Sequence, residues 1–319
     1  MQFRTELAVK PSTSKMDYTS KILMIGSCFA ENIGEKLTYY QFPSMINPMG
    51  ILFQPTALEK WIERVVYLKN YQETDFFKTY ENIWQCYDLH SKNGNESLDK
   101  ALYLANQKLH KTHDFLLNTT HICITFGTAW VYELKESKHL VANCHKMPAS
   151  LFEKKLLGVE EIQTSISKMI QLIHQINPKA SIVFTISPVR HLKDGFVENQ
   201  LSKSRLFVAI NHLLQVTPLG AEGAYFPSYE IMMDDLRDYR FYGADMIHPN
   251  QVAIDYIWEK FCEVYFSETT SNQMEIVGQW QKLKNHRTLN YFNLSPIIQN
   301  KITLLEKQIR SFVDFKSND

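Results

Sequence analysis

Short apolar runs alternate with amphipathic stretches through most of this chain, and that order limits the folds it can adopt. The clearest apolar run, ASIVFTISPV (180–189), follows the helical pattern VEEIQTSISKMIQLIHQINP (159–178). A helix leading into a buried strand is typical of the crossover units of a parallel sheet. Because the order recurs, the sequence predicts an α/β fold with a doubly wound, mainly parallel sheet covered on both faces.

The N-terminal part of the chain repeats this order on a smaller scale. Residues 22–25 form a short apolar run that ends at Gly26, and from Phe29 the apolar residues recur with helical spacing. This pattern predicts a strand, a tight turn and a helix. Polar and apolar residues alternate over 80–97, which indicates a hairpin or an excursion outside the main sheet. Further strands are expected within 43–55, within 121–134 with a break at Gly127, and within 224–233. Further helices are expected over 55–68, 98–117, 199–216 and 248–266.

The character of the chain changes after residue 267. Two helical patterns, 271–293 and 296–315, follow one another without an apolar strand between them. We therefore divide the chain into an α/β domain over 1–267 and a helical C-terminal appendage over 268–319. The appendage is expected either to pack on the core or to pair with another subunit in a homo-oligomer.

Charge and hydropathy exclude several classes of protein. Lys plus Arg equals Asp plus Glu at 34 each, with no basic stripe, so the electrostatic footprint of a nucleic-acid-binding protein is absent. No leader-like N-terminal segment and no run of about 18 apolar residues occurs, so we expect a cytoplasmic protein without a membrane partner. The five cysteines are scattered and form no Cys-x-x-Cys pair, which favours neither a disulfide framework nor a structural zinc site.

Ligands of an open α/β sheet sit beyond the carboxyl ends of the strands, so polar residues just after each expected strand are the candidates for function. These residues are Ser27, Asn47, Gly50, Thr128, Trp130, Arg190, His191, Asp245 and His248.

Three of the candidates have the chemistry of a catalytic triad. A serine hydroxyl needs a base to take its proton, and the usual base is a histidine oriented by a carboxylate. Asp245 and His248 are three residues apart in a loop that enters a helix, and Ser27 begins a helix whose N–H groups favour an oxyanion. Each also has an ordinary structural role open to it: Ser27 as an N-cap, Asp245 in a turn, and His248 as a surface cap. The neighbouring Cys28 is either a nucleophile or a small buried residue.

Several motifs carry a resemblance to a known family. IGSCFAENIG, FGTAWVY, NCHKMP, ISPVRH and SYEIMMDDLRDYRFYGADMIHP occur in the order seen in the GSCFA family of bacterial proteins, over about residues 20–265. That family looks like a branch of the SGNH, or GDSL-type, hydrolase superfamily. The resemblance implies a three-layer α/β/α sandwich of flavodoxin-like type and an ester-hydrolysing activity. It places the nucleophile on Ser27 and the Asp-x-x-His motif on Asp245 and His248.

The resemblance also indicates where an oxyanion hole is expected, and where this chain departs from the pattern. The backbone N–H groups of Ser27 and Gly50 are the expected donors. The superfamily's Gly-x-Asn motif reads Gly127-Thr128-Ala129 here, so alanine stands in place of the asparagine. The Thr128 hydroxyl and the Asn47 amide are the candidate replacements, since losing one donor costs about 3 kcal/mol of transition-state stabilisation.

We expect a serine hydrolase that acts on an ester of a polar or carbohydrate-like small molecule and needs no cofactor. Substrate contacts are expected from Arg190, His191, Trp130 and His145, although the first two also suit surface ion pairs and Trp130 suits packing. The alternatives are acyl transfer at the same triad, and a binding protein that keeps the cleft without activity. A metal site that draws on Cys144, His145, His191 and His248 has no ligand-like spacing to support it.

Overall fold

Five parallel strands form the central sheet of the computed structural model, which describes residues 5–216, 224–285 and 296–313. The strand order is β10-β9-β5-β1-β2. The bounds are Ile22–Gly26 for β1, Ser44–Ile46 for β2, His121–Phe126 for β5, Ser181–Ile186 for β9 and Tyr225–Phe226 for β10. The chain runs from β1 outward to β2 and then crosses to β5 on the other side of β1. The point where the order reverses therefore lies between the carboxyl ends of β1 and β5.

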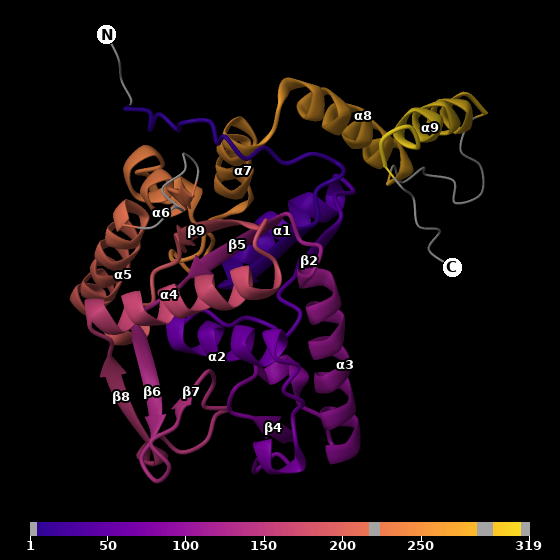
Figure 1. Cartoon of the computed structure of the whole chain (residues 1–319). Helices are drawn as coiled ribbons and strands as arrows, with labels where there is room; N and C mark the ends of the chain where they lie inside the picture. Colours follow the sequence, from indigo (N-terminus) through magenta and orange to yellow (C-terminus); the bar gives the residue numbers. More distant parts are fainter. Residues whose placement is uncertain (1–4, 217–223, 286–295, 314–319) are drawn as a thin grey trace.

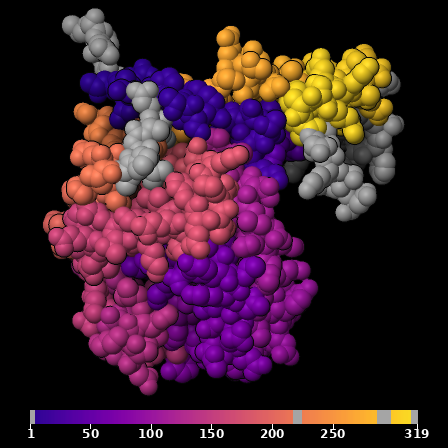
Figure 2. Space-filling view, viewed as in Figure 1, coloured from indigo at the N-terminus to yellow at the C-terminus, as the bar shows by residue number. Residues whose placement is uncertain are grey.

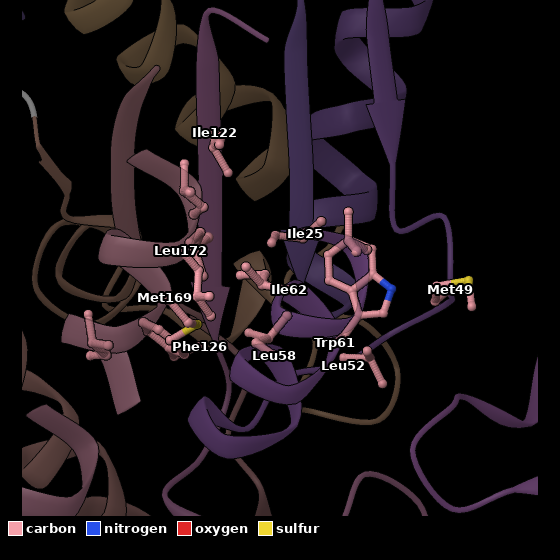
Figure 3. Packing of buried hydrophobic residues seen from close by; sticks show 14 of the residues in the cluster. Ile25, Met49, Leu52, Leu58, Trp61, Ile62, Ile122, Phe126, Met169 and Leu172 are labelled. Atoms are coloured by element: carbon pink, nitrogen blue, oxygen red, sulfur yellow. The ribbon is translucent and has the colours of Figure 1, made fainter. Parts of the chain in front are cut away.

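Helices cover both faces of this sheet, so the predicted three-layer sandwich is confirmed (Figure 1). Alternation along β1 sends Leu23 and Ile25 to one face and Ile22 and Met24 to the other. The first face packs against α2 (Pro55–Val66), α3 (Leu98–Leu116), α4 (Val159–Ile176) and α5 (Phe196–Val216). The second face packs against α1 (Cys28–Tyr39) and α7 (Gln251–Tyr265). Figure 3 shows part of the first core, where Ile25 lies beside Trp61 and Leu58 of α2.

Two small antiparallel sheets lie outside the main one, and the first overlaps the range 80–97, where the sequence predicts a hairpin or an excursion. One is the hairpin of β3 (Phe76–Lys78) and β4 (Trp84–Cys86). The other has β6 (Trp130–Leu134) between β7 (Leu140–Val141) and β8 (Phe152–Leu156). Single 3-10 turns lie at Glu73–Asp75, Ser91–Asn93, Ala149–Leu151, Leu192–Asp194 and Tyr239–Phe241.

The strand expected over 121–134 is broken at Gly127, as predicted, and its two parts, β5 and β6, belong to different sheets. The break falls at Gly127-Thr128-Ala129, whose backbone donors leave the strand ladder. Gly127 N–H donates to the Phe53 carbonyl at 2.8 Å, and Ala129 N–H donates to Ser202 Oγ at 2.7 Å. Apolar periodicity alone does not reveal such a change of partners.

The expected strand over 224–233 is mostly wrong. Only Tyr225–Phe226 pairs with β9, and the chain then forms α6 (Ser228–Glu230) and a π-turn over Ile231–Asp235. Pro227 cannot donate to a strand ladder, and its carbonyl instead accepts from Ile231 N–H at 2.9 Å. The helical turn therefore starts where the proline ends the pairing.

The C-terminal helices α8 (Glu268–Lys284) and α9 (Pro296–Ile309) pack on the core (Figures 1 and 2). Val277 and Trp280 of α8 belong to the same buried cluster as α1 and α7. Gln281 Nε2 also donates to the Tyr39 carbonyl, at the end of α1, at 2.8 Å. Residues 286–293 of the expected helix over 271–293 lie outside the described residues, as do residues 314 and 315 of the expected helix over 296–315. None of the helices described is long and apolar enough to cross a membrane.

Candidate active site

Ser27 stands at the carboxyl end of β1, at the point where the strand order reverses. It is the N-cap of α1, and its Oγ accepts from Phe29 N–H at 3.3 Å. Its own N–H donates to the Thr125 carbonyl at 3.0 Å, which extends the pairing of β1 with β5 by one residue. The side chain is 2% exposed. The strand, turn and helix predicted for this stretch therefore place the hydroxyl at the expected edge of the sheet, just below the surface.

Gly26 lets β1 and β5 remain close at this edge. Its φ is +128°, and a Cβ built on it would stand 2.1 Å from the Thr125 carbonyl oxygen. Its N–H donates to Asn47 Oδ1 at 2.9 Å, so the end of β2 is tied to the end of β1. The amide Nδ2 of Asn47 has no hydrogen-bond partner among the described residues.

Gly50 follows in a tight turn after β2. Its φ is +77°, and its N–H donates to the Asn47 carbonyl at 2.7 Å. A Cβ on Gly50 would stand 2.5 Å from His90 Cβ, so only glycine fits this turn. The N–H expected to face a substrate oxygen is therefore occupied by the turn itself in this conformation.

Asp245 and His248 form a hydrogen-bonded pair in the loop before α7. His248 Nδ1 lies 2.6 Å from Asp245 Oδ2, which fits an imidazole that donates through Nδ1 and leaves Nε2 as the acceptor. Asp245 Oδ1 also accepts from the N–H groups of Ile247 and His248, each at 3.0 Å. These backbone donors and the imidazole lower the pKa of Asp245 to about 2. The carboxylate thus stays ionised and holds the ring in one orientation.

The loop that carries this pair is closed on itself. Gly243 N–H donates to the His248 carbonyl at 2.7 Å, and Asn250 N–H donates to the Phe241 carbonyl at 2.9 Å. The side chains of His248 and Asp245 are 53% and 48% exposed. No hydrogen bond joins His248 to Ser27 among the residues described here. The structure brings two members of the expected triad together and leaves the third beneath the surface at the neighbouring sheet edge.

Thr128 holds β6 and α5 together. Its hydroxyl lies 2.8 Å from Ser202 Oγ and accepts from Trp130 N–H at 3.1 Å. Both atoms are buried in this arrangement. The contacts that Thr128 makes are therefore those of a structural hydroxyl at the start of β6.

His191 lies over the end of β5. Its Nε2 would be 3.1 Å from a Cβ on Gly127, and its ring packs beside Phe53 with centroids 5.2 Å apart. Burial, followed by the charges of Lys203 and His248, lowers the pKa of His191 to about 3. The imidazole is therefore neutral at ordinary pH, and its buried Nε2 has no partner among the described residues.

Lys203 is a residue of this site that the sequence reasoning missed. Its side chain is fully buried, and its Nζ donates to the carbonyl of Ser187, the residue after β9, at 2.7 Å. No carboxylate of the described residues pairs with it, although its Nζ lies 5.6 Å from the centre of the Tyr229 ring. Burial lowers its pKa to about 7. Its spacing in the sequence could have revealed it, because Lys203 falls on the same face of α5 as the buried residues Asn199, Leu206 and Ile210.

The other expected substrate contacts differ in what they touch. Arg190 is half-buried and donates to Met233 Sδ at 2.9 Å, with no carboxylate partner in the described part of the chain. Trp130 Nε1 donates to the Glu198 carbonyl at 3.3 Å. His145 places Nδ1 3.1 Å from Ser91 Oγ and Nε2 2.8 Å from the Cys86 carbonyl. Both ring nitrogens of His145 are thus engaged in holding the β3–β4 excursion.

The cysteines and histidines do not assemble a metal centre in the described residues, where no group of three or more metal-binding side chains converges. The five cysteines, Cys28, Cys86, Cys123, Cys144 and Cys262, are free thiols. Burial raises the pKa of the Cys28 thiol, which disfavours the thiolate that a cysteine nucleophile needs. The chemistry at this edge therefore favours Ser27 over its neighbour.

The GSCFA family model matches residues 21–261, from the first residue before β1 through most of α7. The chain belongs to the GSCFA family. The match includes Ser27, the Asp245–His248 pair, His191 and Lys203, and it ends before α8. No curated protein compared with this GSCFA chain matches it.

Proposed function

We propose that this GSCFA protein is a carboxylic ester hydrolase with Ser27 as nucleophile, His248 as base and Asp245 as the residue that orients the base. The observation that carries the proposal is the 2.6 Å contact between His248 Nδ1 and Asp245 Oδ2. The charge of His248 also acts on His191, which lies against Gly127 at the end of β5, the strand that pairs with β1. The likeness of the GSCFA and ADMIHP motifs to SGNH-type hydrolases supports the same assignment.

In the proposed reaction the Ser27 hydroxyl attacks the ester carbonyl while His248 Nε2 takes its proton. The tetrahedral intermediate then expels the alcohol, which receives that proton from His248, and leaves an acyl group on Ser27. Water attacks the acyl-enzyme with His248 again as base, and the acid is released. Transfer to another acceptor would differ only in this second step. The uncompensated guanidinium of Arg190 suits a polar or anionic part of the substrate.

This reaction requires a movement of the loop around His248. Ser27 is 2% exposed and His248 is 53% exposed, and no hydrogen bond joins them in the described structure. Catalytic hydrogen bonds often tighten only when substrate binds. Because Asp245 holds the loop through three hydrogen bonds, we propose that the Asp245–His248 pair moves as one unit toward Ser27.

The test is labelling with a fluorophosphonate probe followed by intact mass measurement. Wild type and Cys28→Ala are expected to gain one adduct, while Ser27→Ala gains none and His248→Ala reacts at least about 100-fold more slowly. Cys28→Ala is the matched control, because it changes the adjacent side chain and leaves the triad intact. Absence of an adduct on folded wild-type protein, or an adduct that survives in Ser27→Ala, would refute the assignment.

A binding protein without activity is the second candidate, and one observation favours it. The N–H groups of Ser27 and Gly50, the two expected backbone oxyanion donors, are both engaged within the protein. In that case ester turnover on p-nitrophenyl acetate would be the same in wild type and in Ser27→Ala. We also propose a cytoplasmic location and a homo-oligomer formed through the C-terminal helices. Sedimentation of the purified protein measures its oligomeric state.

A further inference from the structure

We propose that the imidazole of His191 supplies the oxyanion hydrogen bond for which residue 129 has no amide side chain. The inference rests on the proposed ester hydrolysis and assigns His191 a catalytic contact with the substrate oxygen. Since Ala129 ends the Gly127-Thr128-Ala129 motif, no amide donor is available at this turn. Some other group at the same sheet edge must then donate if the reaction is to gain from an oxyanion hole.

The donors of the turn itself are already used. Gly127 N–H donates to the Phe53 carbonyl, Ala129 N–H donates to Ser202 Oγ, and the Thr128 hydroxyl is shared with Ser202. A donor that keeps such a bond in the ground state must break it before it can hold an oxyanion. The turn therefore contributes structure at the start of β6, and the free donor has to come from elsewhere.

Four buried side-chain nitrogens of the described residues have no partner: Asn47 Nδ2, Trp61 Nε1, Asn199 Nδ2 and His191 Nε2. Of these four, His191 Nε2 is the one that lies against Gly127, at the end of β5. Asn47 Nδ2 lies at the end of β2, beside a small cavity of about 10 Å³ that Ile25, Leu58 and Trp61 help to line. That cavity is apolar and holds at most about one water molecule. His191 Nε2 instead lies above Gly127, at the end of β5 that adjoins Ser27.

The strand register places Gly127, against which His191 lies, close to Ser27. Gly26 pairs with Thr125, and Ser27 N–H bonds to the Thr125 carbonyl. Gly127 is two residues further along β5, and neighbouring strands are about 4.8 Å apart. A Cβ on Gly127 would stand 3.1 Å from His191 Nε2, so glycine is what allows the imidazole to approach this edge.

The protonation state of His191 suits a donor that does not act as a base. Burial and the charges of Lys203 and His248 keep the ring neutral. A neutral imidazole with its proton on Nε2 donates one hydrogen bond from that atom. It can therefore stabilise a developing oxyanion while remaining uncharged. The charge of Lys203 helps to keep His191 neutral, because it disfavours a second positive charge on the nearby imidazole.

His191 is also held in place before any substrate arrives. Its backbone N–H donates to Asn199 Oδ1 at 2.9 Å, and Asn199 is 1% exposed on α5. Its ring rests against Phe53. A preorganised donor of this kind avoids the cost of reorganisation in the transition state.

The experiment compares p-nitrophenyl acetate with its thiono analogue, in which sulfur replaces the carbonyl oxygen, on wild type, His191→Phe and His191→Asn. His212→Phe is the control, because His212 is an exposed histidine on α5. Loss of one oxyanion donor lowers kcat by about 100- to 1000-fold. We expect that loss for His191→Phe on the oxygen ester, with KM changed by less than about threefold. On the thiono ester, whose sulfur accepts hydrogen bonds poorly, we expect His191→Phe to lower kcat by less than about tenfold.

The conservative variant separates catalysis from structure. His191→Asn carries an amide donor and is expected to recover at least about tenfold of kcat over His191→Phe. Equal losses on both esters, or wild-type kcat in a folded His191→Phe, would overturn the inference while leaving the hydrolase assignment intact. If His191→Phe does not fold, the test uses His191→Asn and His191→Gln. A ratio of kcat on the oxygen ester to kcat on the thiono ester that equals the wild-type ratio in both variants would then overturn the inference. If wild-type turnover does not depend on Ser27, the proposed function fails and this inference fails with it.

Discussion

Replacing Lys203 with methionine is expected to stabilise the protein at neutral pH. Lys203 is fully buried without a carboxylate partner, and burial lowers its pKa from the ordinary 10.5 to about 7. The unfolded chain therefore binds more protons than the folded protein between these values, so wild-type stability rises with pH across that window. At about 1.4 kcal/mol per tenfold change in proton affinity, burial of the ammonium costs about 5 kcal/mol at pH 6.5 and about 3 kcal/mol at pH 8.5.

Methionine has a similar length and removes this cost, but it also leaves the Ser187 carbonyl without its donor. An orphaned buried acceptor costs about 1–3 kcal/mol, which partly offsets the gain. We therefore expect Lys203→Met to be more stable than wild type by about 2–3 kcal/mol at pH 6.5. That advantage should fall by about 2 kcal/mol at pH 8.5.

The assay is urea unfolding of wild type and Lys203→Met at both pH values. His191 and Cys28 face Lys203, but the pKa of His191 is about 3 and that of Cys28 is raised above its ordinary 9.0, so neither titrates in this range. Lys111→Met, on the exposed side of α3, is the control and should show no pH-dependent difference. A stability difference that is equal at pH 6.5 and pH 8.5 would refute the assignment of a depressed pKa to Lys203.

Three further outcomes are expected. Gly26→Ala should destabilise the protein by at least about 3 kcal/mol in urea unfolding, because its Cβ would meet the Thr125 carbonyl oxygen at 2.1 Å and its φ is +128°; a loss below about 1 kcal/mol would contradict this. Trp280→Ala should cost about 3–5 kcal/mol in one cooperative transition, since Trp280 shares a core with α1, and a separate early transition would show that α8 unfolds independently. Asp245 should titrate near pH 2 by carboxyl-carbon NMR, and His248→Ala should move that value upward because one of its hydrogen bonds is lost. An unshifted Asp245 titration would contradict the pairing.

The order of elements was predictable because each crossover unit carries its own hydrophobic pattern. The strand at 22–25 and the helix over 159–178 follow from local periodicity, and the structure has β1 and α4 there. The break at Gly127 was also predictable, because glycine interrupts the apolar run there, but the move of β6 to a separate sheet was not. That move and the helical turn after Pro227 depend on which partner a backbone donor finds in three dimensions, and apolar periodicity does not encode that choice.

The candidate site shows the same division. Asp245 and His248 lie three residues apart in one loop, so the hydrogen bond between them follows from local geometry. The buried charge of Lys203 depends instead on a contact between separate elements, because α5 brings its Nζ to the Ser187 carbonyl after β9. Charged residues on a helix are usually solvated, and only the depth of α5 in the fold makes Lys203 unusual.

Helix α1 connects the C-terminal helices to Ser27, the proposed nucleophile. Gln281 of α8 holds the Tyr39 carbonyl at one end of α1, and Ser27 caps the other end. With 12 residues at about 1.5 Å each, α1 is a rod of about 18 Å. A rotation of about 3° about its anchored end displaces Ser27 by about 1 Å, a misplacement that costs about 100-fold in a positioned reaction. A shift of α8 where Gln281 holds the Tyr39 carbonyl would therefore move Ser27, even though α8 does not contact Ser27 through this hydrogen bond.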